Sequence, residues 1–262
     1  MKASLILPCF NRAKLLDIGL FSISKYSTKI PYEVIVINDG IIDETEEVCN
    51  KYKKLLDIKY YFSGQRNIDK VKSRVPAYAI NIGVKKATGD IIVLSSPEVY
   101  HLNQALNYLF APLLKKDNIM TTVKMVHFDD SNEITDNLLK NKKNTLSGEV
   151  ISELNFDKIK GKEAVTMPFL LAFYKKHFMN IRGYDEDFIG YACDDNDFMD
   201  RMKKYGLRLQ KTDGEILHLY HQGTNISPLA KPDNPEWLYN YNLYKSRQDI
   251  IKRNENREWG VL

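Results

Sequence analysis

The sequence has few of the features that mark secreted, zinc-binding or membrane-spanning proteins. It contains only three cysteines, Cys9, Cys49 and Cys193, and no Cys-x-x-Cys pair. This spacing argues against a disulfide framework and against a zinc ribbon. No apolar run approaches the roughly 20 residues of a membrane span. The strand-like run 3–7 after Lys2 is also too short for a signal peptide. We therefore expect a cytoplasmic chain without a membrane span.

The charge has little excess of one sign. The formal net charge is +4 over 262 residues, and Lys and Arg form no long run. Strong basic clustering is typical of nucleic-acid-binding proteins, so we expect no nucleic acid among the partners. A weak positive balance suits an anionic small ligand. The length fits one large α/β domain or two small ones.

Short apolar runs alternate with helical patterns in the first half of the chain. Runs rich in β-branched or aromatic residues predict strands at 3–7, 33–37, 58–62, 91–94 and 119–123. Pro8 is expected to end the first strand, and Asn11 and Asp43 are candidate helix caps. This alternation is typical of a mostly parallel, doubly wound sheet with helices on both faces.

The second half is less regular. The polar stretch 129–162 predicts a surface excursion near the acceptor side. Apolar runs at 169–174 and 215–220 predict two more strands, and a helix is expected to begin at Asp194. The aromatic-rich tail 237–257 predicts one further helix.

Glu98 lies where a ligand site is expected. The strand 91–94 follows the turn residues Thr88-Gly89 and is itself followed by Ser95-Ser96-Pro97-Glu98. Ligands of open α/β sheets bind beyond the carboxyl ends of strands. The alternative is that Pro97 and Glu98 form only a turn.

Four motifs occur in a fixed order along residues 3–223. They are Leu7-Pro8-Cys9-Phe10-Asn11-Arg12, Val36-Ile37-Asn38-Asp39-Gly40 through Thr45, Ala79-Ile80-Asn81-Ile82-Gly83 with Ala87-Thr88-Gly89-Asp90, and Gly183-Tyr184-Asp185-Glu186 through Asp197. Together they resemble the family 2 type glycosyltransferases with the GT-A fold. The last motif resembles the galactosyltransferase-like C-terminal half of chondroitin-polymerase-like enzymes.

This resemblance implies transfer of a sugar from a nucleotide diphosphate sugar, expected to be a UDP-sugar, to an acceptor hydroxyl with inversion. The acceptor would be a glycan, a lipid-linked sugar or a protein. It also implies a single GT-A domain over 1–262. The nucleotide-binding half would be 1–100, the acceptor and catalytic half 101–225, and a C-terminal tail helix would occupy 226–262.

The resemblance also assigns residues to the donor. These positions are Pro8, Phe10, Asn11, Arg12, Asp39, Arg74 and Ser96. Asp39 would accept a hydrogen bond from the base, and an aromatic such as Phe10 can stack on it. The alternative for Asp39 is a turn residue before Gly40. Arg74 would pair with the diphosphate through its guanidinium group, or it is a solvated surface arginine.

The metal-binding motif of the family, Asp-x-Asp, falls on Ser96-Pro97-Glu98, which lacks the first carboxylate. A diphosphate leaving group needs its charge neutralised, so Mn²⁺ or Mg²⁺ is still expected, with Glu98 as one ligand. His221 resembles the late histidine of chondroitin-polymerase-like enzymes and is the preferred second ligand. Positions 218 and 221 face opposite ways on a regular strand. We therefore expect His218 to be a core histidine.

Three carboxylates meet at the expected helix start Asp194-Asp195-Asn196-Asp197. Capping and the helix dipole would account for one of them. The resemblance makes Asp195 the general base that takes the proton of the acceptor hydroxyl. Asp194 would then bind the acceptor or the donor sugar.

Two other functions remain open. A nucleotidyltransferase shares the doubly wound plan, although it would require a glycine-rich basic loop after the first strand. A catalytically silent sugar-nucleotide or glycan binding module would explain the altered Asp-x-Asp.

Overall fold

The computed structural model describes residues 1–64, 75–127, 135, 136, 138, 170–221 and 234–262. Arg74 and most of the expected excursion 129–162 lie outside the described residues. Within the described ranges, no helix combines the length and apolar character needed to cross a membrane.

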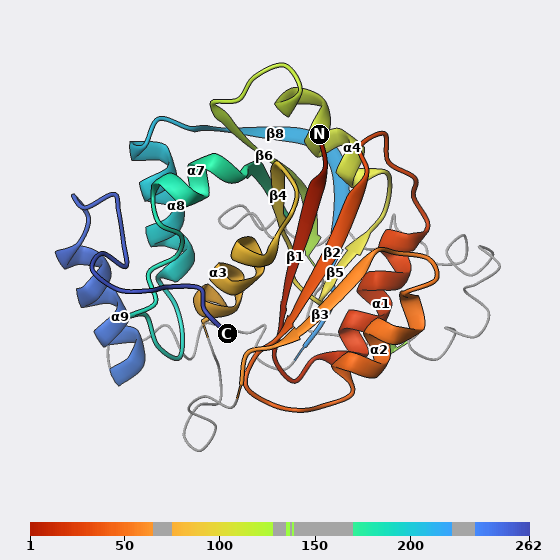
Figure 1. Cartoon of the computed structure of the whole chain (residues 1–262), viewed down its shortest axis with the longest axis horizontal. Coiled ribbons are helices and arrows are strands. Elements are labelled where there is room, and N and C mark those ends of the chain that lie inside the picture. Colours follow the sequence, from red (N-terminus) through yellow and green to blue (C-terminus); the bar gives the residue numbers. More distant parts are fainter. Residues whose placement is uncertain (65–74, 128–134, 137, 139–169, 222–233) are drawn as a thin grey trace.

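Helices and strands alternate in the first part of the chain, up to residue 94 (Figure 1). The strands are β1 (Ala3–Cys9), β2 (Tyr32–Asn38), β3 (Ile58–Phe62), β4 (Ile91–Leu94), β5 (Val99–His101), β6 (Ile119–His127), β7 (Leu171–Tyr174) and β8 (Arg208–His218). The helices are α1 (Ala13–Ser24), α2 (Thr45–Tyr52), α3 (Ala77–Lys86), α4 (Ala105–Leu113), α7 (Lys175–Asn180), α8 (Asp194–Lys204) and α9 (Pro235–Ser246).

The strands form one mixed sheet with the order β3-β2-β1-β4-β7-β6-β8-β5. The pairs β1–β2, β1–β4, β2–β3 and β6–β8 are parallel, whereas β7 is antiparallel to β4 and β6, and β5 is antiparallel to β8. The sheet is thus mostly parallel, as predicted. Strands β1, β2 and β4 end at the same edge, called here the carboxyl edge.

Both faces of the sheet are covered, which explains why β4 and residues 34–37 of β2 are apolar without interruption. Side chains alternate between the two faces, so Leu5 and Leu7 of β1 pack into one core and Ile6 packs into the other. The first core contains α1, α2 and α4. The second contains α3, α7, α8 and the buried Trp259.

Two predictions at the first strand are wrong. Pro8 does not end the strand, which continues to Cys9. Strand β4 pairs with β1 only as far as Ile6, so proline lies where β1 has an open side. Asn11 does not cap the next helix. It has a φ of +51°, which asparagine tolerates better than most residues, and α1 begins at Ala13 without a side-chain cap.

The C-terminal tail is not a single helix, and this corrects the predicted helix over 226–262. Helix α9 ends at Ser246, and residues 247–262 are irregular. The backbone N–H of Arg253 donates to Ile181 O at 3.2 Å instead of to a carbonyl of its own segment. Contacts with distant segments therefore replace helical hydrogen bonds in this tail.

Glu33 joins the Ala-Thr-Gly-Asp motif to the first two strands. Its fully buried carboxylate accepts hydrogen bonds from Ser4 Oγ (2.6 Å), Thr88 N and Oγ1 (both 2.7 Å) and Lys59 Nζ (2.6 Å). Burial alone would raise the pKa of Glu33, but these donors outweigh it and lower the pKa from 4.5 to about 2.

We expect Glu33→Ala to lower the free energy of unfolding by about 1–3 kcal/mol at pH 7, because buried donors lose their acceptor. The folded-state pKa is depressed, so this contribution is present above pH 4.5 and disappears as the pH falls towards 2. Urea denaturation across that range measures it. Asp57→Ala, which removes only an exposed ion pair with Lys2, is the control. Equal effects of the two variants would contradict the prediction.

Candidate active site

Glu98 is buried in the turn that follows β4 at the carboxyl edge, and its side chain is 5% exposed. Helix α1 packs against this turn at Gly19, where a Cβ atom would lie 2.8 Å from Pro97 O. The glycine therefore permits the close approach. Arg12, just before α1, then reaches Glu98, and its Nη1 donates to Oε1 at 2.7 Å.

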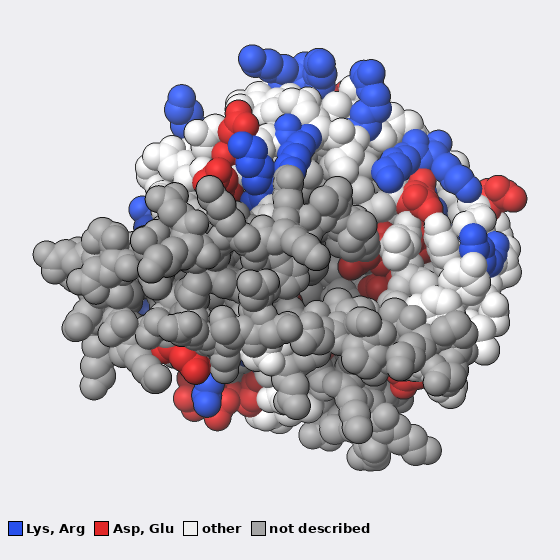
Figure 2. Space-filling view, turned by 180° about the vertical axis from the view of Figure 1, so that it is seen from behind, with Lys and Arg blue, Asp and Glu red and all other residues white. Residues whose placement is uncertain are grey.

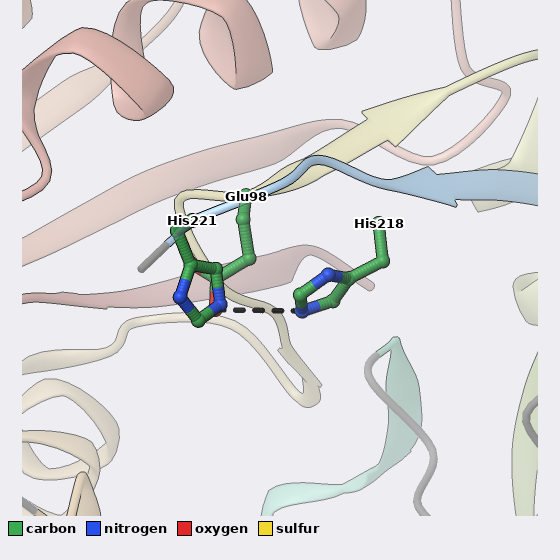
Figure 3. Close-up of side chains that lie close together, drawn as sticks. All are labelled: Glu98, His218 and His221. Atoms are coloured by element: carbon green, nitrogen blue, oxygen red, sulfur yellow. Dashed lines mark ion pairs between the residues drawn. The ribbon is translucent and has the colours of Figure 1, made fainter. Parts of the chain in front are cut away.

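Both histidines of the late motif lie beside Glu98 (Figure 3). The distances to Glu98 Oε1 are 3.7 Å from His218 Nε2 and 3.5 Å from His221 Nε2. The prediction that only one of them could reach the site is wrong. Strand β8 ends at His218, and the irregular chain beyond it, with Leu219 N bonded to Glu98 O at 2.8 Å, breaks the alternation of sides.

Positive groups surround the Glu98 carboxylate. Burial alone would raise the pKa of Glu98, but Arg12, His218 and His221 outweigh it and hold the pKa below its ordinary value. The carboxylate is therefore ionised at neutral pH. Arg12 also lies near the second histidine, with 3.3 Å between Nη2 and His221 Nδ1.

The three side chains fit a divalent cation. One ligand atom from each of Glu98, His218 and His221 can be chosen so that all lie within 4.8 Å of one another. Two ligands at about 2.1 Å from one ion lie at most about 4.2 Å apart, which agrees with the 3.5 and 3.7 Å separations. Glu98 Oε2 is buried and has no hydrogen-bond partner among the described residues. It is therefore available as a ligand.

The predicted donor residues that the structure describes lie at the same edge. Pro8 and Phe10 are partly exposed at the end of β1, and Asn11 is exposed beside them. Asp39 follows β2, is 2% exposed and accepts a hydrogen bond from Ser63 Oγ at 2.7 Å. Ser63 was not predicted and follows the neighbouring strand β3. The donor role of these residues stays a prediction.

The structure also shows the surroundings of Asp43 and Ser96. The Asp43 carboxylate accepts a hydrogen bond from Thr45 N at 3.0 Å at the start of α2, but the N-cap of this helix is Glu44 and not the predicted Asp43. Ser96 Oγ is buried without a hydrogen-bond partner in the part of the chain that the structure describes. It lies two residues before Glu98 and stays a predicted donor contact.

The acidic helix α8 begins at Asp194, as predicted. Its far end lies shortly before Arg208, which pairs with Ile119 at the amino end of β6. The N-terminus of α8 therefore points towards the carboxyl edge, as Figure 1 also shows.

Tertiary contacts give the three carboxylates of α8 different surroundings. Asp197 accepts hydrogen bonds from Arg201 Nε at 2.7 Å and Arg253 Nη2 at 2.6 Å, and all three side chains are buried. Arg253 also forms an ion pair with Asp185 at 3.0 Å. Asp197 is thereby occupied in a structural network.

Asp194 and Asp195 remain as the pair available for chemistry. Asp194 is 5% exposed, and its Oδ2 has no hydrogen-bond partner among the residues described. Burial raises the pKa of Asp194 well above its ordinary value, and the neighbouring Asp195 adds to this. Asp195 is partly exposed, and burial raises its pKa too. Of the two, only Asp195 has both a raised pKa and a carboxylate that is partly exposed to solvent.

Tyr184 orients Asp195 and was not predicted to do so. Its hydroxyl donates to Asp195 Oδ1 at 2.9 Å, and its ring stacks on Phe198 with 4.3 Å between centroids. A hydrogen bond to the ionised form lowers a carboxyl pKa, so Tyr184 opposes the effect of burial on Asp195.

Tyr184→Phe is therefore expected to raise the pKa of Asp195 while keeping the ring stack. The predicted role of Asp195 is that of a general base, which acts in its ionised form, so the acidic limb of the kcat/KM profile should move to higher pH. Measurement of sugar transfer between pH 5 and pH 9 checks this. Tyr174→Phe, which removes a hydroxyl bonded to Leu113 O and lies on β7, is the control. A shift to lower pH would contradict the assignment.

Comparison with known proteins defines the class. The fold is that of the GT-A glycosyltransferases. The chain belongs to glycosyl transferase family 2, whose family model matches residues 4–182. A second family model, described as the N-terminal domain of galactosyltransferase, matches residues 153–222. The predicted resemblance is confirmed in both halves of the chain.

The individual relatives share little sequence identity with this chain. Chondroitin synthase from Escherichia coli is 24% identical over 249 residues, which cover 84% of this chain and 34% of that protein. The chain thus spans about a third of that relative. S. aureus TarS 1–349 in complex with UDP-GlcNAc superposes with a TM-score of 0.65 and 16% identity, over 94% of this chain and 66% of the TarS 1–349 chain. GalNAc-T7 with UDP, GalNAc and Mn²⁺ gives 0.62 and 16%, over 93% and 50%.

Proposed function

We propose that this protein transfers a sugar from a UDP-sugar to an acceptor hydroxyl, with inversion at the anomeric carbon. The observation that carries the proposal is that a candidate metal site and a candidate general base both lie at the carboxyl edge. A metal-competent cluster formed by Glu98, His218 and His221 follows β4 and β8, and a perturbed, accessible carboxylate, Asp195, begins α8.

The donor half of the site would act on the nucleotide. Asp39 would accept an N–H of the uracil, and Phe10 would lie against the base. Both are placed where nucleotides bind in α/β folds, beyond the ends of β1 and β2. Similarity to proteins solved with UDP or UDP-GlcNAc supports a uridine nucleotide.

A divalent cation, Mn²⁺ or Mg²⁺, would be held by Glu98, His218 and His221. When bound, it supplies positive charge to the diphosphate leaving group. The imidazoles suit Mn²⁺ better than Ca²⁺. Arg12 is close enough to assist, because its guanidinium already faces the same carboxylate.

Asp195 would take the proton of the acceptor hydroxyl as that oxygen attacks the anomeric carbon from the face opposite the leaving UDP. Asp194 would hold a sugar hydroxyl. Its raised pKa favours a protonated carboxyl, which can donate a hydrogen bond as well as accept one. The chain would thus present one proton acceptor and one sugar-binding carboxyl side by side.

The proposal is tested by UDP release from UDP-Glc, UDP-Gal, UDP-GlcNAc, UDP-GalNAc and UDP-GlcA with Mn²⁺ and a panel of saccharide acceptors that offer a free hydroxyl, together with thermal-shift measurements on the same donors. Ligand at 100 times its Kd adds about 2.7 kcal/mol of stability. Binding without UDP release would replace the proposal with a silent binding module. Pyrophosphate formation from UTP and a sugar phosphate would replace it with a nucleotidyltransferase.

Arg12→Gln tests whether Arg12 competes with a metal ion for the Glu98 carboxylate. The substitution removes the cation bonded to Glu98 Oε1, so Mn²⁺ should bind the nucleotide-free protein about tenfold more tightly or better. UDP affinity should fall, because one positive charge near the diphosphate is lost. Calorimetry with Mn²⁺ and UDP separately measures both effects, with Lys14→Gln as an exposed control. Weaker Mn²⁺ binding in Arg12→Gln would contradict competition for Glu98.

A further inference from the structure

The loop 189–193, which leads into the acidic helix, has an unusual backbone. Gly190, Ala192 and Cys193 have φ values of +54°, +77° and +71°. Two consecutive residues with side chains are thus held in the left-handed region, which they rarely adopt. Such a conformation persists only where the surroundings determine it. Because Cys193 is the N-cap of α8, whatever holds this loop also fixes the position of Asp195.

Asn240 of α9 holds the loop. Its side chain is fully buried, and its Nδ2 donates to Ile189 O and to Tyr191 O, both at 2.6 Å. Its Oδ1 accepts a hydrogen bond from Ile189 N at 3.1 Å. One side chain therefore binds three backbone groups on the two sides of Gly190.

A second residue of α9 closes on the loop from the same side. A Cβ atom at Gly190 would lie 2.0 Å from Glu236 Oε2, so the carboxylate occupies the space that a side chain would need. The helix itself is fixed at both ends. Asn234 caps it through Glu236 N (3.0 Å), and the Tyr244 hydroxyl bonds to Asp200 of α8.

We propose that Asn240 is a positioning residue for sugar transfer, acting through the backbone of 189–191 to place the Asp195 carboxylate against the acceptor hydroxyl. This role rests on the proposed function of Asp195 as general base. The proposed role of Asn240 involves no contact with the donor or the acceptor. Its contribution is the geometry of the base, and misplacement of a catalytic group by about 1 Å can cost about 10²-fold in rate.

The test compares Asn240→Ala with Asn103→Ala. Asn103 also accepts from a backbone N–H (Glu215 N, 3.0 Å) and donates to a backbone carbonyl (Asp213 O, 3.4 Å), but it lies beyond the end of β5 that is farther from Glu98. We expect Asn240→Ala to lower kcat for UDP release about 10- to 100-fold. Affinity for UDP with Mn²⁺ should stay within about twofold of wild type, because only the acceptor side is moved. Asn103→Ala should change neither quantity. Unchanged kcat in Asn240→Ala would overturn the proposal.

A double-mutant cycle separates positioning from general damage. In the Asp195→Asn background, adding Asn240→Ala should lower the residual rate by less than about twofold, since residues that act as one unit are not additive. Independent, multiplicative losses would overturn the positioning role.

Hydrogen exchange provides a readout that requires no turnover. Amides of 189–195 should exchange faster in Asn240→Ala than in wild type, while those of β1 and β2 stay unchanged. If Asn240→Ala does not fold, Gly190→Ala disturbs the same contact from the loop side and should give the same pattern. Absence of UDP release by the wild type would overturn the proposed function itself, whereas normal exchange and normal kcat in folded Asn240→Ala would overturn only the positioning role.

Discussion

Asp195→Asn is expected to lower sugar transfer by about 10²- to 10⁴-fold, the range for loss of a general base. The amide keeps the size of the side chain and can still accept the hydrogen bond from Tyr184, but it cannot take the acceptor proton. Donor binding should be retained, because Asp39 and Glu98 lie on other elements of the site. Initial rates and UDP affinity measured on the same sample check both statements.

The neighbouring carboxylates supply the controls for this prediction. Asp194→Asn should lower turnover less than Asp195→Asn does, because the role proposed for Asp194 is to hold a sugar hydroxyl. Asp197→Asn should act mainly through the free energy of unfolding, since it weakens a buried pair with Arg201 and Arg253. Near-normal transfer by Asp195→Asn would remove the base assignment and leave the family membership untouched.

The second large effect is expected at the metal cluster. Glu98→Gln should weaken Mn²⁺ binding in the presence of UDP by about 10²-fold and reduce turnover in step. Loss of even an outer partner of a metal ligand typically costs about 10- to 100-fold in affinity. EDTA should abolish activity in the wild type, and added Mn²⁺ should restore it.

The two histidines make this prediction specific. His218→Ala and His221→Ala should each raise the Mn²⁺ concentration needed for half-maximal activity. His177→Ala is the control, because that buried histidine bonds to Asp117 O and lies on α7. Full activity in EDTA would exclude a required metal. An unchanged Mn²⁺ requirement in all three cluster variants would place the metal on other ligands.

The surface shows why the formal charge alone is a poor guide to the site. Figure 2 shows the molecule from the side opposite to Figure 1, with Lys and Arg side chains along the upper rim and Asp and Glu among them. Pairs such as Lys176 with Asp117, at 2.6 Å, balance locally. The charges that matter for the proposed chemistry lie elsewhere, at the buried Glu98 and the partly exposed Asp195.

The amino-acid sequence by itself determined the architecture. Uninterrupted apolar runs such as 34–37 and 91–94 can be buried on both faces only in a covered, mostly parallel sheet. That sheet in turn places residues after each strand, Glu98 among them, at one edge. Local chemistry also determined the start of α8 at Asp194, because carboxylates favour the N-terminus of a helix.

Only the tertiary structure decided which of these side chains act together. His218 joins the cluster because β8 stops there, and the end of a strand depends on its neighbours as much as on its own residues. Asp197 is occupied by Arg253, a residue 56 positions away, which leaves Asp195 exposed for chemistry. Asn240 reaches the loop before α8 across 49 positions. Hydrogen bonds and ion pairs of this kind depend on distances of about 3 Å, which spacing along a chain does not encode.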